Sequence, residues 1–100
     1  MANQFSVSVI DDGQLAIVGE LSQHSIIGKQ NKYFQEVIDN PNPVIDLSSI
    51  NKIDTAGLAW LICLNEYALN NQISLTYSQP PQELVKLAKL SQVYDFLPWQ

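Results

Sequence analysis

Arginine is absent from this sequence of 100 residues, and its five basic residues are all lysines. The chain therefore lacks the bidentate side chain that reads guanine and clamps most phosphate groups. Ten acidic residues give a formal net charge of −5, which disfavours contact with a phosphate backbone. We therefore expect no nucleic-acid partner.

Cysteine and long apolar runs are also scarce. Cys63 is the only cysteine, so the chain can form no internal disulfide and is compatible with a reducing compartment. The longest nearly uncharged apolar run, residues 56–64, is far shorter than the roughly 20 residues that span a bilayer. Residues 1–10 show no basic start followed by a long apolar stretch, and thus no signal peptide. These features predict a cytoplasmic protein without direct membrane insertion.

Residue patterns for catalysis and cofactor binding are missing as well. His24 is the only histidine, and no third residue completes a catalytic set with Cys63. Ser48 and Ser49 lack the Gly-x-Ser-x-Gly context of a nucleophile, and no glycine-rich loop with a lysine is present to hold phosphates. Asp46 borders a loop, and hydrogen bonding within that loop explains an acidic residue there without acid-base catalysis. We expect no enzyme, no catalytic residue, no metal and no cofactor.

What is present is a regular succession of strand and helix signals. Residues 4–20 alternate apolar and polar side chains on both sides of a turn at 11–13, which predicts a β-hairpin. Ser22 is a suitable N-cap for a helix that the proline-rich segment at 40–43 ends. The apolar face of this helix consists of Ile26, Ile27, Tyr33, Phe34, Val37 and Ile38.

The second half of the chain continues in the same way. It predicts a buried strand at 44–47, a helix from Thr55 to Asn70–Asn71, a strand at 73–77, a helix that Pro80 and Pro81 begin, and a short strand or extended tail at 93–100. The apolar face of the last helix consists of Leu84, Leu87, Ala88 and Ser91.

The predicted order is β-β-α-β-α-β-α, in one domain over residues 1–100 that is large enough for a single core. Strands joined through helices pair in parallel by right-handed crossovers, whereas a hairpin is antiparallel. We therefore expect an α/β fold with a mixed sheet of four to five strands and three helices.

The helix that begins at Thr55 carries apolar residues on two sides. At about 100° per residue, the side suited to the sheet consists of Leu58, Leu61, Asn65 and Ala68. The opposite side consists of Ala56, Ala59, Trp60, Cys63 and Tyr67, which is the composition of an interface centre. We expect this side to face a partner, or a second copy when the chain is isolated. The alternative is that the C-terminal tail covers Trp60 and Tyr67 and makes them core.

Asp54 and Thr55 stand at the beginning of this helix. Both are good N-cap residues, and capping alone explains them. A phosphate on Thr55 would also meet unpaired N–H groups and the positive end of the helix dipole, so Thr55 is a candidate phosphorylation site. Gly57 costs about 1 kcal/mol relative to alanine within a helix, which indicates close backbone approach to a neighbouring strand or to a partner.

The segment VIDLSSINKIDTAGLAWL, residues 44–61, resembles the central signature of STAS domains, the fold of anti-sigma factor antagonists. In that signature a strand ends in Asp-Leu-Ser, and Asp-Ser/Thr-x-Gly-Leu begins a helix after a short loop. The predicted order of elements agrees with the STAS fold over residues 5–97. The resemblance implies a single STAS domain that binds other proteins.

Within that fold, the chain is most similar to MlaB-like proteins, the STAS subunits of Mla phospholipid-transport ABC complexes in Gram-negative inner membranes. Asp54-Thr55, the apolar second helix and LAKL at 87–90 carry this similarity, whereas Ala56 replaces a glycine of the family pattern. It implies a module without enzymatic activity, peripheral to the inner membrane. This module docks on a cytoplasmic MlaF-like ATPase, which acts with a permease to maintain outer-membrane lipid asymmetry. The interface that the resemblance implies consists of Asp54, Thr55, Ala56, Ala59, Trp60, Cys63 and Tyr67.

The resemblance to STAS domains also leaves an alternative function, that of an anti-sigma factor antagonist controlled by phosphorylation. In this alternative a kinase modifies Thr55 and adds about −1.5 to −2 charges. Such a charge on an apolar contact surface would disfavour docking, because it must lose its hydration. A stable assembly and a reversible switch thus share the same predicted surface.

Overall fold

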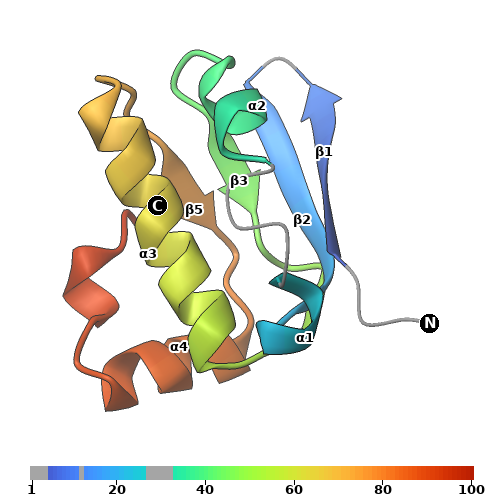
Figure 1. Ribbon diagram of the computed structural model, residues 1–100, viewed down its shortest axis with the longest axis vertical. Coiled ribbons are helices and arrows are strands. Elements are labelled where there is room, and N and C mark those ends of the chain that lie inside the picture. Colours follow the sequence, from blue (N-terminus) through green and yellow to red (C-terminus); the bar gives the residue numbers. More distant parts are fainter. Residues whose placement is uncertain (1–4, 12, 27–32) are drawn as a thin grey trace.

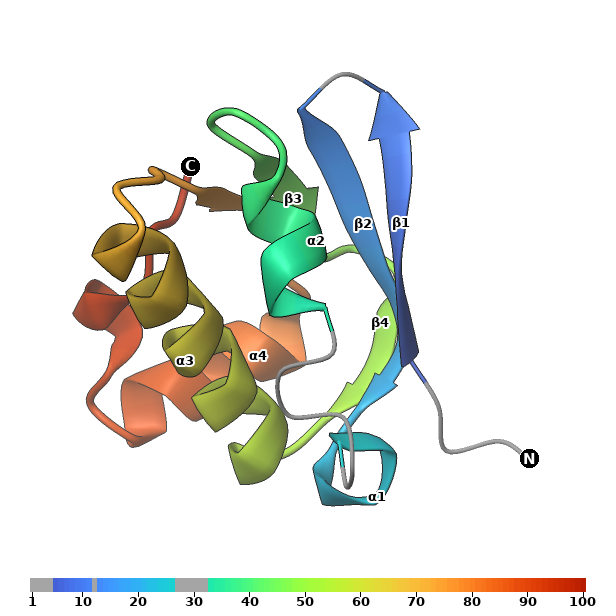
Figure 2. The same cartoon turned by 45° about the horizontal axis from the view of Figure 1, so that its top comes forward.

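The helices of the protein cover one face of a five-stranded mixed sheet (Figures 1 and 2). The computed structural model describes residues 5–11, 13–26 and 33–100. The predicted α/β class and the mixed sheet are confirmed. The described part of the chain contains four α-helices and one short 3₁₀ helix rather than three helices.

The N-terminal hairpin forms as its alternating pattern predicts. Strand β1 (Phe5–Asp11) pairs antiparallel with β2 (Gln14–Leu21). Phe5 and Val7 are buried, whereas Ser6 and Ser8 are exposed on the opposite side of the strand. Alternate side chains of a strand point to opposite faces of the sheet, so the apolar set lies on the face that the helices cover.

Strand β2 pairs in parallel with two different short strands. Its residues 14–16 pair with β3 (Val44–Asp46), and its residues 19–21 pair with β4 (Ile50–Ile53). Strand β4 is not among the predicted strands, because Asn51 and Lys52 are both exposed and the segment does not alternate. The remaining strand is β5 (Thr76–Ser78), parallel to β3. It begins three residues later than predicted, and the Ile73 N–H instead donates to Ala68 at the end of the preceding helix.

The helices follow their sequence signals to different degrees. Where one helix was predicted after Ser22, the structure has α1 (Gln23–Ile26) and α2 (Phe34–Ile38), and residues 27–32, with Ile27, lie outside the described residues. The Ser22 hydroxyl accepts a hydrogen bond from the His24 N–H at 3.2 Å, as its predicted capping role requires. The two remaining α-helices are α3 (Thr55–Asn70), with the predicted limits, and α4 (Gln82–Leu90).

The core lies between the sheet and the helices. Tyr77 of β5 is completely buried, and its hydroxyl donates a hydrogen bond to the Leu61 carbonyl of α3 at 2.7 Å. Burial raises the pKa of this hydroxyl well above its usual range, with a smaller contribution from Cys63. Leu58, Leu61 and Ala68 are buried, as predicted for the side of α3 that faces the sheet.

The C-terminal segment packs against the outer edge of β5. It contains the 3₁₀ helix η1 (Tyr94–Phe96) and an extended end in which Trp99 forms a parallel bridge with Tyr77. The predicted short strand or extended tail thus exists as a single bridge. Among the described residues, none of the helices combines the length and apolar character needed to cross a bilayer.

Candidate protein-interaction surface

The carboxylate of Asp54 joins the beginnings of two helices. One oxygen, Oδ1, accepts a hydrogen bond from the Gly57 N–H of α3 at 3.0 Å, so Asp54 is the N-cap that the sequence predicts. The other oxygen, Oδ2, accepts from the Gln23 N–H, the first residue of α1, also at 3.0 Å. One side chain therefore fixes the position of α1 relative to α3.

These hydrogen bonds decide the charge state of Asp54. Partial burial by itself raises the pKa of the carboxyl, but hydrogen bonds from the backbone N–H groups of Gln23, Gly57 and Ala56, together with His24, lower it by more. The net result is a pKa below the ordinary value of 3.8. Asp54 is therefore ionised at neutral pH and places a negative charge beside Thr55.

Gly57 lies where α3 passes closest to the sheet. A Cβ atom at this position would lie 2.0 Å from the carbonyl oxygen of Leu21 and 3.0 Å from Cγ1 of Ile53. The close approach predicted from this glycine is therefore to the end of β2 and not to a partner. The contact holds the first turn of α3 against the sheet, and so fixes where Thr55 stands.

The side of α3 that remains open to solvent carries small side chains. Thr55, Ala59 and Cys63 are exposed, at intervals of four residues along the helix, and Ala56 is half-buried. Residues at this spacing share one helix face. The described structure thus brings together four of the predicted interface residues, with Asp54 beside them at the helix start.

Trp60 does not belong to the open surface that was predicted to include it. Its side chain is 3% exposed, and the expectation that it faces outward is wrong. Its ring lies 5.2 Å from that of Phe5 in β1 and 5.3 Å from that of Phe34 in α2, measured between centroids. The alternative that the C-terminal tail covers it is also wrong, because β1 and α2 provide the cover.

Tyr67 also belongs more to the fold than to an open surface. It is half-buried, its ring centroid lies 5.3 Å from that of Phe34, and its hydroxyl donates a hydrogen bond to Oε1 of Gln35 at 3.0 Å. Phe34 and Gln35 both belong to α2. Tyr67 therefore connects α3 to α2, and the contact surface loses the two aromatic anchors predicted for it.

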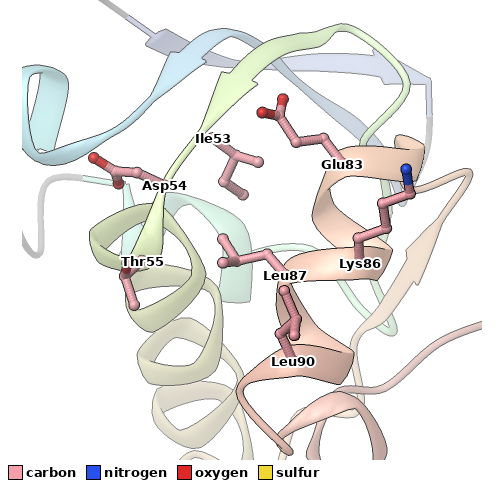
Figure 3. A pocket seen from close by; sticks show the side chains of 7 residues that line it. All are labelled: Ile53, Asp54, Thr55, Glu83, Lys86, Leu87 and Leu90. Carbon is pink, nitrogen blue, oxygen red and sulfur yellow. The ribbon is translucent and has the colours of Figure 1, made fainter.

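A hollow beside Thr55 supplies apolar surface in their place. It lies between the beginning of α3 and α4 (Figure 3), and Leu90, one of its walls, is 82% exposed. This hollow was not predicted from the sequence, although Leu87 and Leu90 continue the three-residue spacing of Leu84. The residues that line it are Ile53, Asp54, Thr55, Glu83, Lys86, Leu87 and Leu90.

Other residues considered for chemistry have structural roles or lie apart. Asp46 accepts a hydrogen bond from the Ser48 N–H at 2.8 Å, as expected for a residue that orders a loop. Within the three described ranges, no group of three or more His, Cys, Asp or Glu side chains is arranged to hold a metal ion. The candidate site consists of an exposed face of α3 and the adjacent apolar hollow.

Comparison with known proteins identifies the fold. Neither a protein-family model nor a curated protein sequence matches the chain. Among solved structures, the anti-sigma factor antagonist SpoIIAA in its unphosphorylated form is similar with a TM-score of 0.61 and 14% identity, over 95% of this chain and 84% of that one. A candidate anti-sigma factor antagonist from Thermotoga maritima has a TM-score of 0.70 and 16% identity, with the same coverage. The chain has the STAS fold.

In the STAS fold of this chain, the Asp54-Thr55 pair stands at the N-terminus of α3, where the resemblance to the STAS signature placed it. The similarity in sequence to the two solved structures is low, and it is the arrangement of strands and helices that they share with this chain.

Proposed function

We propose that this protein is a STAS-type binding module without enzymatic activity. It docks on the cytoplasmic ATPase of an ABC phospholipid transporter that acts with a permease to maintain outer-membrane lipid asymmetry. The observation that carries the proposal is the apolar hollow beside Thr55, in which Leu90 is 82% exposed. In this proposal the protein is cytoplasmic and reaches the inner membrane through its partner.

The composition of the surface suits a lasting contact. Ala59 and Cys63 are small, so a partner helix can approach the backbone of α3 closely. Leu90 supplies most of the apolar area that a partner would remove from water, and full burial of an exposed leucine side chain contributes ~1.5–3 kcal/mol. Leu87, half-buried against the core, adds less. Thr55 supplies a polar contact at the edge of this area.

Co-purification with the transporter ATPase tests the proposal. Thr55→Arg and Ala59→Arg each place a long charged side chain on the open face of α3 and should abolish co-purification. Ser8→Arg is the matched control, because Ser8 is exposed in β1, on the other side of that strand from buried Val7. If both α3 variants bind the ATPase as well as Ser8→Arg does, the proposed surface is wrong.

A second candidate function is that of an anti-sigma factor antagonist, and the comparisons favour it. Both compared structures are described as actual or candidate members of this class, one of them in its unphosphorylated form. The exposed hydroxyl of Thr55 is accessible to a kinase. A phosphate there would stand beside the ionised Asp54 and the acidic Glu83, and would repel a partner seated in the hollow.

The modification state of Thr55 separates the two candidates. Under the transporter proposal, the protein purified from its own cells carries no phosphoryl group, and Thr55→Val still binds the ATPase. Under the switch proposal, mass spectrometry finds a phosphoryl group on Thr55, and Thr55→Glu loses a kinase-like anti-sigma partner that Thr55→Val retains.

A further inference from the structure

A second apolar hollow lies near the other end of α3. Its walls come from α3 and from the C-terminal segment around η1. Leu69 on one wall is 59% exposed and Phe96 on the other is 70% exposed. The residues that line it are Ile62, Asn65, Glu66, Leu69, Val93 and Phe96.

The wall formed by the C-terminal segment is held in place. The Val93 N–H donates to the Ala88 carbonyl at 3.0 Å, and Nε1 of Trp99 donates to the Tyr94 carbonyl at 2.8 Å. The rings of Tyr94 and Trp99 also stack, with centroids 5.3 Å apart. The hollow is therefore formed before any partner arrives, which lowers the entropy lost on binding.

Among the residues that line the hollow, Glu66 is the one that carries a charge, and that charge is negative. Asp95, next to Phe96 in the sequence, lines another hollow together with Lys89. The nearby Lys89 has its ammonium group 5.0 Å from the centre of the Tyr94 ring, where the aromatic face attracts it. The whole chain has a net charge of −5. A second copy would bring like charges together, whereas a basic partner would find complementary ones.

We propose that this hollow binds an amphipathic helix of a partner protein, which presents two large apolar side chains next to lysine or arginine. Ile62 and Glu66 continue the open side of α3 beyond Ala59 and Cys63, so the hollow extends the docking surface to the far end of the helix. The inference rests on the proposed function, because it extends the same surface. From Ile62 to Leu69 the helix advances about 10 Å, which matches side chains two turns apart on a partner helix.

Binding of two synthetic helical peptides tests the inference. Both contain about 18 residues with leucines along one stripe, and they differ only in having lysine or glutamate at the flanking positions. Fluorescence anisotropy at physiological salt should show the lysine peptide binding at least about tenfold more tightly. The double variant Leu69→Ser, Phe96→Ser should weaken that binding by at least about tenfold. The matched control is Ile10→Ser, Val18→Ser, which removes two exposed apolar side chains from the hairpin and should leave binding unchanged.

Three results would overturn the inference. They are equal binding of the two peptides, equal binding by the two double variants, and a dimer in sedimentation velocity that only Leu69→Ser, Phe96→Ser dissociates. Circular dichroism checks that both double variants fold. A failure of the proposed function gives a different result. In that case Thr55→Arg still binds the ATPase, whatever the peptide affinities are. If Thr55→Arg loses the ATPase and Leu69→Ser, Phe96→Ser retains both ATPase and peptide, only the second hollow is wrong.

Discussion

The backbone N–H of Gln23 donates a hydrogen bond of 3.0 Å to Oδ2 of Asp54, across 31 residues of sequence. Asp54 also caps α3 through its other oxygen, so the beginning of α1 and that of α3 depend on a single carboxylate. Thr55 follows Asp54 directly. The carboxylate of Asp54 therefore helps to hold the beginning of the proposed contact surface in place.

Stability should depend on pH through Asp54. Its pKa in the folded protein lies below the ordinary value of 3.8, so between the two values the unfolded chain binds more protons than the folded one. The stabilising contribution is complete above the ordinary pKa and is lost as pH falls through the folded one. Asp54→Asn, which cannot accept the Gln23 bond with its nitrogen, should be less stable by ~1 kcal/mol at pH 7.

Urea denaturation of wild type and Asp54→Asn measures this effect. The pH is varied between 3 and 7 in steps of about half a unit. The difference between wild type and Asp54→Asn should be constant in the upper part of this range and shrink at the acidic end. A difference that is independent of pH would show that the charge of Asp54 does not contribute.

Gly57→Ala should destabilise the protein, although alanine is the better helix former. The added methyl group would lie 2.0 Å from the Leu21 carbonyl oxygen, so α3 must move away from β2 at a cost of ~1–3 kcal/mol. An exposed glycine in a helix would instead gain ~1 kcal/mol from the same change. The free energy of unfolding in urea gives the sign directly, and stabilisation would contradict the close approach.

Trp60→Ala should destabilise the protein by ~3–5 kcal/mol, because it empties a buried site between β1, α2 and α3. Cys63→Ala, on the exposed side of the same helix, should change stability by no more than ~0.5 kcal/mol. Thermal and urea denaturation of the pair compare the two sides of α3. Equal stability of the two variants would mean that Trp60 is not core.

Most of the fold can be predicted from the sequence, because the patterns that indicate its strands and helices are local. Alternation in residues 4–20, the cap at Asp54 and the prolines before α4 each determine their own element. Strand β4 was not predicted, since its pairing with β2 leaves Asn51 and Lys52 exposed and the segment shows no alternation of apolar and polar residues. Whether a strand forms at such a segment depends on the partner strand and not on the segment itself.

The candidate site was harder to predict, for a related reason. Periodicity shows correctly that α3 has two apolar sides, but not which element covers the second one. Phe34 and Phe5 occupy that position, far from Trp60 in the sequence, and their packing buries Trp60 while Ala59 and Cys63 stay exposed. The hollow lined by Leu90 depends equally on how α4 lies against α3, which no local pattern specifies.

The central claim is that the open face of α3 beginning at Thr55 is the docking surface, and the affinity for the purified ATPase tests it most directly. Isothermal titration should give a Kd for Thr55→Arg that is weaker than that of Ser8→Arg by at least about 100-fold, since the long arginine side chain would occupy the space beside the hollow that the partner needs. Urea denaturation should show both variants folded, because Thr55 and Ser8 are exposed. Equal affinities of the two folded variants would contradict the claim.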